Sequence, residues 1–410
     1  MMKILIISPY LPYPLDDGDK IRLFNLIRRI AYKYEVSIVS FVRSLQEEQF
    51  IPELKKYCSQ VEIVLMKERS KLAKLHALIQ CLVSGDPLES KFAFDYEMKE
   101  KIRRLVARHH FDIIQIEHTF MAPYIKVIPN AYNAKKIIAI YNIGFIQFYR
   151  MFRIERALYT KIRYFINWTM MKKWEVKFLE NFDKCITVSF QDKQILNSEN
   201  QKLDVSVIQN GVDVNKYRPL PVNSGTKNIL FIGFMDYVAN HDAALYFYHE
   251  IFPIIKKQIP HSKFFIVGKN PKQGIKELTK DKDVIVTGYV NDVRSYYQDC
   301  DISVVPLRAG GGTRLKILEA MAFGRPVIST SIGCEGLDVV NGHHLLIADD
   351  AQQFAEKTLR LLSDRKLYKR IVREARQLIA SKYDWDAIAE QLLIVYSEIT
   401  LKPELRTKTH

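Results

Sequence analysis

The chain has 410 residues, 48% of them hydrophobic, which predicts two or three domains with full cores and excludes a disordered chain. Its five cysteines are scattered and none lies in a CxxC pair, which argues against a zinc site or a disulfide framework and indicates a reduced, cytoplasmic protein. The net charge of +15 is concentrated in residues 1–202, where 33 Lys and Arg face 22 Asp and Glu, and it leaves nucleic acid, an anionic membrane and a phosphate-bearing substrate open as partners.

The first half of the chain alternates short apolar runs with amphipathic segments. The opening apolar run is broken by Pro9, Pro12 and Pro14 and is too short for a signal peptide or a membrane span, so we expect a buried strand there. The expected strands are residues 4–8, 36–42, 61–66, 112–117, 136–142, 182–189 and 205–210, and the expected helices are residues 21–34 and 96–110.

A domain boundary is expected at "VIQNGVDVNKYRPLPVNSGTKN", which combines Asn-Gly, two prolines and a Gly/Ser segment. We therefore expect an N-terminal domain over residues 1–208, a linker over 209–226 and a C-terminal domain over 227–383. A final helix, in residues 384–410, is expected to pack back toward the N-terminal domain.

The second half repeats the alternation. Its expected strands are residues 228–234, 263–268, 284–290, 301–307, 326–330 and 344–349, and its expected helices are residues 240–259, 351–364 and 385–400. Apolar strands alternating with helices predict an α/β protein of two facing Rossmann-like domains, each with a parallel sheet, and a cleft between them. Ligands bind at the carboxyl ends of such strands, where we expect the loops Asp16–Lys20 and Ala309–Thr313.

The stretch "AGGGTRLKILEAMAFGRPVIST" carries the strongest chemical signal. Gly310–Gly312 allow close approach of the backbone to a ligand, and Thr313 is a reasonable N-cap for the helix that follows. Arg314 and Lys316 oppose the helix dipole unless an anion binds there, which indicates a phosphate site, and Glu319 can accept hydrogen bonds from a ribose diol. The plainer alternative is a surface turn with solvated cations, in which Glu319 pairs with Lys316.

Several blocks in order along the chain resemble the retaining glycosyltransferases of the GT-B fold, group one or family four, nearest to bacterial enzymes that build exopolysaccharide or other surface glycans. They are "YPLDDGDKIRLFNL", "TVSFQDK", "VIQNGVDVNKY", "LFIGFMDYVAN", "TGYVNDVRSYYQDCDISVVPL" and "GGGTRLKILEAMAFGRPVIST". The resemblance implies transfer of a hexose-type sugar from a nucleoside-diphosphate donor to a glycan or lipid-linked acceptor.

The resemblance also implies roles for individual residues. Lys316 and Arg314 would meet the diphosphate as catalytic cations, and Glu319 would hold the ribose. The other implied donor contacts are Gly18, Gly233, Val290, Gly311, Gly312 and Thr313. Gly311 stands where the family's EX7E pattern has its first glutamate, and Tyr141 stands where the family often has His. His118, after the previous expected strand, is therefore the substitute catalytic candidate, although a lone His is more often structural.

No metal or other cofactor is expected. The two DxD sequences, Asp281–Asp283 in a polar loop and Asp384–Asp386 at a helix start, are interpreted as structural.

Residues 145–184, the basic aromatic segment, hold nine Lys and Arg and four Asp and Glu, with Phe148, Tyr149, Phe152, Tyr164, Phe165, Trp168, Trp174 and Phe178 interleaved. Residues 67–83 add a second basic amphipathic stretch. Three interpretations compete: contact with anionic membrane lipid, binding of single-stranded nucleic acid, or helices that pack their rings inward. We favour membrane over nucleic acid, which gives a protein peripheral to the inner face of the membrane.

Two rivals to the transferase stay open at this point. One is a nucleotide-sugar 2-epimerase of the same fold. The other is a catalytically inactive partner in a glycan pathway, or a basic binding protein.

Overall fold

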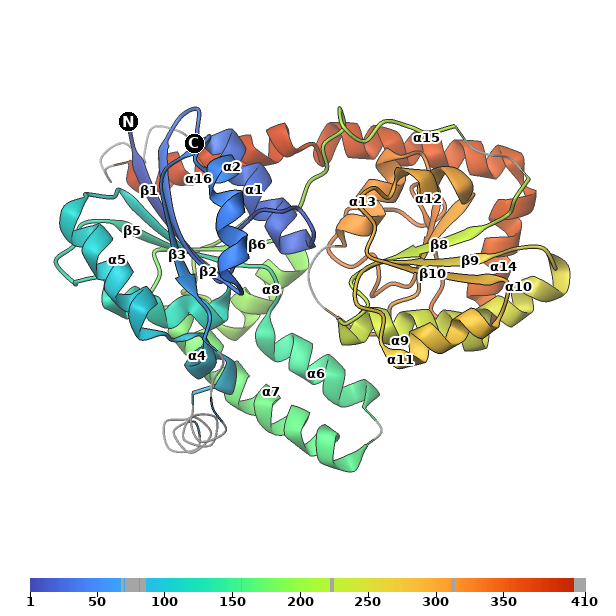
Figure 1. Ribbon diagram of the computed structural model, residues 1–410, viewed down its shortest axis with the longest axis horizontal. Coiled ribbons are helices and arrows are strands. Elements are labelled where there is room, and N and C mark those ends of the chain that lie inside the picture. The colour runs from blue at the N-terminus through green and yellow to red at the C-terminus, as the bar shows by residue number, and fades with distance from the viewer. Residues whose placement is uncertain are drawn as a thin grey trace. The chain divides into compact units, whose positions relative to one another are not determined.

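The computed structural model describes residues 1–67, 70, 81, 86–155, 157–221, 225–310 and 314–401. The chain folds into two compact units. Unit 1 comprises residues 1–209 and 386–410, and unit 2 comprises residues 210–385. Each unit has a parallel sheet of its own, as Figure 1 shows, so the expectation of an α/β protein with two parallel-sheet domains is confirmed.

Unit 1 is built on seven strands in the order β3-β2-β1-β4-β5-β6-β7, and every neighbouring pair is parallel. The strands are apolar because helices cover both faces of such a sheet, and five of the six residues of β1 are buried. The strands are β1 (Lys3–Ser8), β2 (Glu35–Val42), β3 (Cys58–Leu65), β4 (Ile113–Glu117), β5 (Lys135–Ile140), β6 (Lys184–Thr187) and β7 (Val205–Val207).

The helices of unit 1 include one from the far end of the chain. In that helix, the Tyr396 hydroxyl donates to buried Gln115 of β4 at 2.7 Å, and Asp386 pairs with Arg29. The helices are α1 (Gly18–Ile30), η1 (Leu45–Phe50), α2 (Ile51–Leu54), α4 (Leu88–Ala93), α5 (Tyr96–Arg108), η2 (Thr119–Val127), α6 (Gly144–Ile154), α7 (Leu158–Leu179), α8 (Phe190–Glu199) and α16 (Trp385–Thr400).

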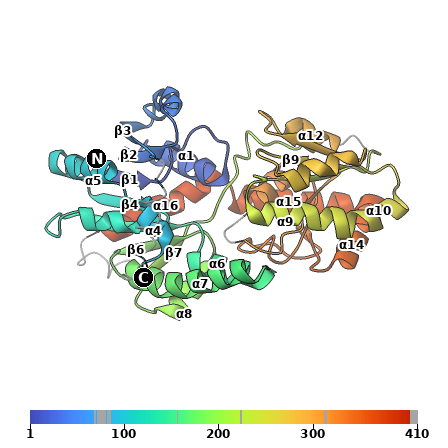
Figure 2. The ribbon, with the colours of Figure 1, turned by 60° about the horizontal axis from the view of Figure 1, so that its bottom comes forward.

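Helices α6 and α7 form a hairpin that contains most of the basic aromatic segment. They run side by side, and the last residues of α6 and the first residues of α7 lie at the end away from the sheet (Figures 1 and 2). Ring contacts join Tyr149 to Trp168 at 5.0 Å and Phe152 to Phe165 at 5.7 Å between ring centroids. Inward packing therefore accounts for these rings. Among the described residues, no helix is long and apolar enough to cross a bilayer.

Unit 2 has six parallel strands in the order β10-β9-β8-β11-β12-β13. The strands are β8 (Ile229–Ile232), β9 (Phe264–Val267), β10 (Val284–Gly288), β11 (Ile302–Val305), β12 (Val327–Ser329) and β13 (Leu346–Ile347). The helices are α9 (Val238–Tyr246), η3 (Phe247–Ile251), α10 (Phe252–Gln258), α11 (Gln273–Lys276), η4 (Glu277–Lys280), α12 (Arg294–Asp299), α13 (Leu315–Ala322), α14 (Ala351–Ser363) and α15 (Arg365–Lys382).

The single helix expected over residues 240–259 is divided by a π-helical turn, η3. Pro253 follows this turn at the start of α10. A proline has no N–H to donate and its ring collides with the carbonyl four residues earlier, so the backbone widens before it.

Residues 210–221, expected to lie in the linker, are fastened to unit 2 by two arginines. Arg325 donates to the carbonyls of Leu220 at 3.1 Å and Pro221 at 2.7 Å, and Arg376 donates to those of Val214 and Tyr217, both at 3.0 Å. Their guanidinium forks satisfy carbonyls that no strand or helix pairs.

Candidate active site

The start of α13 differs from its expected form. Residues 311–313 lie outside the described residues, so the structure says nothing of Gly311, Gly312 and Thr313. The N-cap of the helix is Arg314, not Thr313, because Arg314 has extended backbone angles and helical geometry begins at Leu315. At Gly310 the φ of +117° favours glycine, and a Cβ there would also lie 2.6 Å from Nη2 of Arg314, at the movable end of that side chain.

Lys316 lies in the first turn of α13 with its amine half-buried. Its Nζ donates to Oδ1 of Asn240 on α9 at 2.7 Å and lies 4.6 Å from the centre of the Phe231 ring. Burial, with the nearby charge of Arg314, lowers the pKa of Lys316 to about 7. Asn240 is held in turn, since its Nδ2 donates to the carbonyl of Phe234 at 2.9 Å.

Two glycines make room for this lysine. A Cβ on Gly233 would lie 2.8 Å from both Lys316 Nζ and Asn240 Nδ2. Gly268, with φ +151°, lies so close to Gly233 that a Cβ there would fall 1.7 Å from the Gly233 carbonyl oxygen. The ends of β8 and β9 therefore approach each other as only glycine permits.

Glu319 lies one turn beyond Lys316 on α13. Burial raises its pKa to about 7, against the lowering effect of Lys216 and Lys316. Within the described part of the chain, Lys316 bonds to Asn240 and makes no ion pair with Glu319. The Glu319–Lys316 ion pair of the plainer alternative is therefore absent from the described residues, while its surface turn falls largely outside them.

These residues gather at one edge of the unit 2 sheet. Gly233 follows β8, Gly268 follows β9, Val290 lies two residues after β10, and Arg314 follows β11. The four strands are neighbours in the order β10-β9-β8-β11, so their carboxyl ends lie side by side. Val290 packs partly against the core of unit 2. This is the edge at which parallel sheets bind ligands.

A second polar cluster lies at the carboxyl edge of the unit 1 sheet. His118 follows β4 with φ 68°, and its Nε2 lies 2.9 Å from the Tyr10 hydroxyl and 3.4 Å from Oδ2 of Asp19. The ring packs on Phe120 and Tyr141, with centroids 5.2 and 4.5 Å away. Burial lowers the pKa of His118 to about 4, so the imidazole is neutral near pH 7.

Tyr141 lies beside His118 at the end of β5 but is buried. The Arg22 guanidinium lies 5.3 Å from its ring centre, and Arg22 also donates to the carbonyls of Ile208 and Gln209 at 2.7 and 2.8 Å. Burial and the Glu117 charge raise the pKa of Tyr141 well above its usual value. Tyr141 therefore packs against the His118 ring. The His118 side chain itself remains 11% exposed to solvent.

Gly18 begins α1, where Asp17 is the N-cap and accepts from the N–H groups of Asp19 and Lys20 at 2.9 and 3.2 Å. Two N–H groups of this helix start are thus already satisfied. A phosphate contact at Gly18 stays a prediction.

The aspartates of the two DxD sequences have partners within the protein. Asp283 pairs with Lys256 at 2.7 Å, Asp384 accepts from the N–H of Val214 at 3.3 Å, and Asp386 pairs with Arg29. Over the described ranges, no group of three or more His, Cys, Asp or Glu side chains is placed to hold a metal ion.

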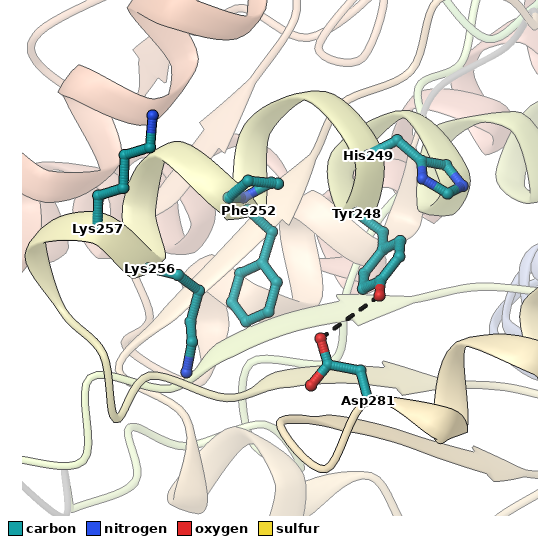
Figure 3. A pocket seen from close by; sticks show the side chains of 7 residues that line it. Tyr248, His249, Phe252, Lys256, Lys257 and Asp281 are labelled. Atoms are coloured by element: carbon teal, nitrogen blue, oxygen red, sulfur yellow. Dashed lines mark hydrogen bonds between the residues drawn. The ribbon is translucent and has the colours of Figure 1, made fainter.

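A shallow pocket on unit 2 lies elsewhere. It is lined by residues of η3 and α10 and by Asp281, which accepts from the Tyr248 hydroxyl at 3.4 Å (Figure 3). Asp281 precedes β10, so this pocket lies at the amino ends of the strands, opposite the edge that carries Lys316.

Two family models match the chain. The model described as Glycosyltransferase Family 4 matches residues 21–216, and the model described as Glycosyl transferases group 1 matches residues 226–364. An uncharacterised 44.6 kDa protein in the cps region of Klebsiella pneumoniae is 23% identical over 395 residues, which are 94% of this chain and 97% of that protein.

Two solved structures extend the comparison. Sucrose-phosphate synthase from Thermosynechococcus elongatus superposes with a TM-score of 0.73 at 18% identity, over 97% of this chain and 99% of that one. HepE from Anabaena, in complex with UDP-glucose, gives 0.68 at 16% identity, over 97% and 100%. These likenesses show a shared fold.

Proposed function

Because the chain belongs to the group 1, family four glycosyltransferases, which have the GT-B fold and use nucleotide-sugar donors, we propose that it transfers a hexose-type sugar with retention of configuration. The proposed acceptor is a glycan or a lipid-linked glycan, and the proposed chemistry needs no metal ion. HepE binds UDP-glucose, and the Klebsiella relative lies in a cps region, which supports a UDP-type donor and a polysaccharide pathway.

The observation that carries this proposal is the setting of Lys316. A half-buried amine, with a neutral amide and a ring face as its neighbours, lies at the carboxyl edge of four adjacent strands. Its position is kept open by Gly233, where any side chain would collide with it. An amine held this way is preorganised for an anion that arrives with the ligand.

In the proposed reaction, the bond between the sugar's anomeric carbon and the donor phosphate breaks as the acceptor hydroxyl attacks from the same face. Negative charge then builds on the departing diphosphate, which takes the acceptor's proton. Lys316 and Arg314 would stabilise that charge, while Glu319 would accept hydrogen bonds from the ribose and the loop at Val290 would hold the base. On unit 1, His118, positioned by Tyr10, would bond to a sugar or acceptor hydroxyl.

The test is a donor panel of UDP-, GDP- and ADP-sugars, with calorimetry for binding and product analysis for transfer. We expect one donor class to bind, and Lys316→Ala to lower kcat/KM by a hundredfold or more, since removing one group that stabilises developing charge costs about 2.7–4 kcal/mol. The matched control is Lys257→Ala, on the exposed face of α10, which should leave kcat/KM unchanged.

Three results would count against the proposal. Equal effects of the two substitutions would remove Lys316 from the donor site. Failure of every nucleotide sugar to bind would reject the donor class. Conversion of the donor to a 2-epimer, with no sugar transferred, would replace transfer by the rival activity.

A further inference from the structure

The start of α7 exposes an apolar stripe to solvent. Leu158, Ile162, Phe165 and Ile166 follow one another at spacings of four, three and one residues, so they share one side of the helix, with Tyr159 at its border. Their exposed fractions are 74% for Leu158, 81% for Tyr159, 51% for Ile162, 45% for Phe165 and 47% for Ile166. Scattered exposed apolar side chains are ordinary, but a contiguous group of five at one end of a hairpin marks a contact surface.

This exposure does not come from a poorly packed hairpin. The opposite sides of α6 and α7 are joined by the rings of Tyr149, Phe152 and Trp168. At the other end of the hairpin, buried Glu175 accepts from the N–H groups of Gly144 and Phe145, both at 3.1 Å. Phe165 also packs into the hairpin, with its ring centre 5.7 Å from those of Phe152 and Trp168, but Leu158, Tyr159 and Ile162 stay at least half exposed and are left for another partner.

Positive charge surrounds the stripe. At 100° per residue, Lys161 and Arg163 fall on either side of it. The exposed Lys173 and Lys177 follow on the same side, further along α7. Residues 144–166 contain five Lys and Arg and a single acidic residue, Glu155, which is occupied by the N–H of Ala157 at 2.9 Å.

We propose that this tip surface, made of Leu158, Tyr159, Ile162, Phe165 and Ile166 with their flanking cations, docks on an anionic lipid bilayer. The apolar side chains enter the boundary between headgroups and acyl chains, and the cations meet the lipid phosphates. In this arrangement the helix lies on the membrane and does not span it. A nucleic acid would need the cations at the centre and exposed rings to stack on, whereas the centre here is mainly aliphatic.

The inference adds to the proposed function the surface at which the enzyme works, because a bilayer is where lipid-linked acceptors are found. It rests on the exposed residues of α7 and not on the donor site.

Co-sedimentation with vesicles tests the electrostatic part. We expect binding to phosphatidylcholine vesicles that contain ~30% phosphatidylglycerol, with much weaker binding to phosphatidylcholine alone and a loss in high salt. The charge variant is Arg163→Gln/Lys173→Gln/Lys177→Gln, expected to weaken partitioning by about fivefold for each cation removed. The matched control is Arg103→Gln/Arg104→Gln/Arg108→Gln, exposed cations of α5, expected to change it far less.

The apolar part is tested separately. Leu158→Gln/Tyr159→Gln/Ile162→Gln should reduce binding to the anionic vesicles by about tenfold or more, whereas Tyr32→Gln/Tyr96→Gln, which changes side chains with exposed fractions of 70% and 75%, should not. A fluorophore on Tyr159→Cys should shift to the blue on these vesicles, and one on Tyr96→Cys should not. All five native cysteines are buried, so the label goes to the new one.

Two outcomes would overturn the inference. One is vesicle binding that the tip variants leave unchanged. The other is self-association of the wild type, seen by sedimentation and lost in the apolar variant, which would make the tip surface a contact between copies of the chain. Calorimetry with the nucleotide sugar on the same variants keeps the two proposals apart, since donor affinity should be unaltered in all of them.

Discussion

Lys316 is placed so that its charge is costly until an anion arrives. Its amine has a neutral hydrogen-bond acceptor in Asn240, a ring face in Phe231 and a second cation, Arg314, close by. A bound diphosphate would place negative charge beside both cations, adding to the contribution of the nearby Glu319 carboxyl, whose own pKa is raised to about 7. The lowered pKa of Lys316 is therefore a property of the unliganded protein, and binding of a diphosphate should raise this pKa again.

We predict that donor affinity falls as pH rises above about 7. The pKa of Lys316 is lowered to about 7 in the unliganded protein, so above that pH the amine is mostly neutral, while the donor diphosphate binds the charged form. Binding must then take up a proton, and affinity should drop by up to about tenfold per pH unit until the pKa of the bound state is reached. Calorimetry in buffers of different ionisation enthalpy measures that uptake.

In Lys316→Met the proton uptake by the amine should vanish, and any pH dependence left in the weaker residual binding should be that of the Glu319 carboxyl, whose pKa is also raised to about 7. Lys257→Met should keep the wild-type slope. If Lys316→Met kept the full wild-type proton uptake, a group other than Lys316 would be the one that titrates.

Replacement of Gly233 by alanine should mainly lower activity, whereas the same replacement at Gly268 should mainly lower stability. In Gly233→Ala the new Cβ meets the ends of two side chains, Lys316 and Asn240, which can move. We expect kcat/KM to fall about tenfold or more with a stability loss of no more than about 1–2 kcal/mol. In Gly268→Ala the Cβ meets backbone at 1.7 Å and φ is +151°, so unit 2 should lose several kcal/mol or fail to fold.

Kinetics and urea denaturation on the same preparations separate the two effects. A Gly233→Ala enzyme with full kcat/KM would show that the Lys316 amine need not stay where the structure has it.

Sequence reasoning could find only part of this site. Lys316 and Glu319 stand out because they lie three residues apart on the helix after a glycine run. Asn240 is 76 residues from Lys316, and Tyr10 is 108 residues from His118. Contacts over such distances come from the strand order of the sheets, which local spacing does not encode. Tyr10 and Asp19 could have been found from their positions in the sequence. Both follow the first strand, and His118 follows a strand that pairs with it, so all three are expected at the same edge of the sheet.

At the scale of elements, the start of α6 depends on a carboxylate from α7. Glu175 is fully buried and accepts the N–H groups of Gly144 and Phe145. Burial nevertheless raises its pKa to about 7, from an ordinary value of 4.5. Between these two values the folded protein keeps a proton that the unfolded chain releases.

We therefore predict that the free energy of unfolding falls as pH rises from about 5 to about 8, with Glu175 contributing up to about 3 kcal/mol of the change. This contribution is fully present below the unfolded pKa and is lost as pH passes through the folded pKa. Urea denaturation at several pH values measures it. Glu175→Gln, which carries no titrating proton, should reduce the slope to the part that other carboxyls with raised pKa values, such as Asp19 and Glu319, contribute, while exposed Glu180→Gln should leave the slope unchanged. Identical slopes in wild type and Glu175→Gln would contradict the assignment.

The strands were predictable at this scale and some helices were not. Apolar runs such as β1 and β4 are buried on both faces, so composition alone marks them. Helix α15 was missed although it has an Asp364 N-cap and buried residues at helical spacing, from Leu367 through Ile371 and Ala375 to Ile379. The segment contains many charged residues, and its regular apolar stripe was therefore not recognised from the sequence. The π turn before Pro253 could not be placed, because a proline also permits an ordinary kink.

At the scale of the molecule, each unit has a hydrophobic core of its own. The larger clusters of buried residues are composed of unit 1 residues in one case and unit 2 residues in the other. Two such cores need not unfold together, so a single transition is not expected for this chain. The charge excess of residues 1–202 belongs to unit 1, which also carries the tip surface, whereas the proposed donor contacts lie mostly on unit 2.

This separation predicts that a nucleotide stabilises the units unequally. Scanning calorimetry should show two transitions, which core substitutions can assign. Ile102→Ala should lower the transition of unit 1 and Ile371→Ala that of unit 2, since both side chains are fully buried and each loss costs about 2–5 kcal/mol. A nucleoside diphosphate at a hundred times its Kd adds about 2.7 kcal/mol to the state that binds it, which should raise the unit 2 transition by a few degrees. Lys316→Ala should abolish that rise. A nucleotide that raised the unit 1 transition alone would place the principal donor contacts on the other sheet, with His118 and Gly18, and not with Lys316.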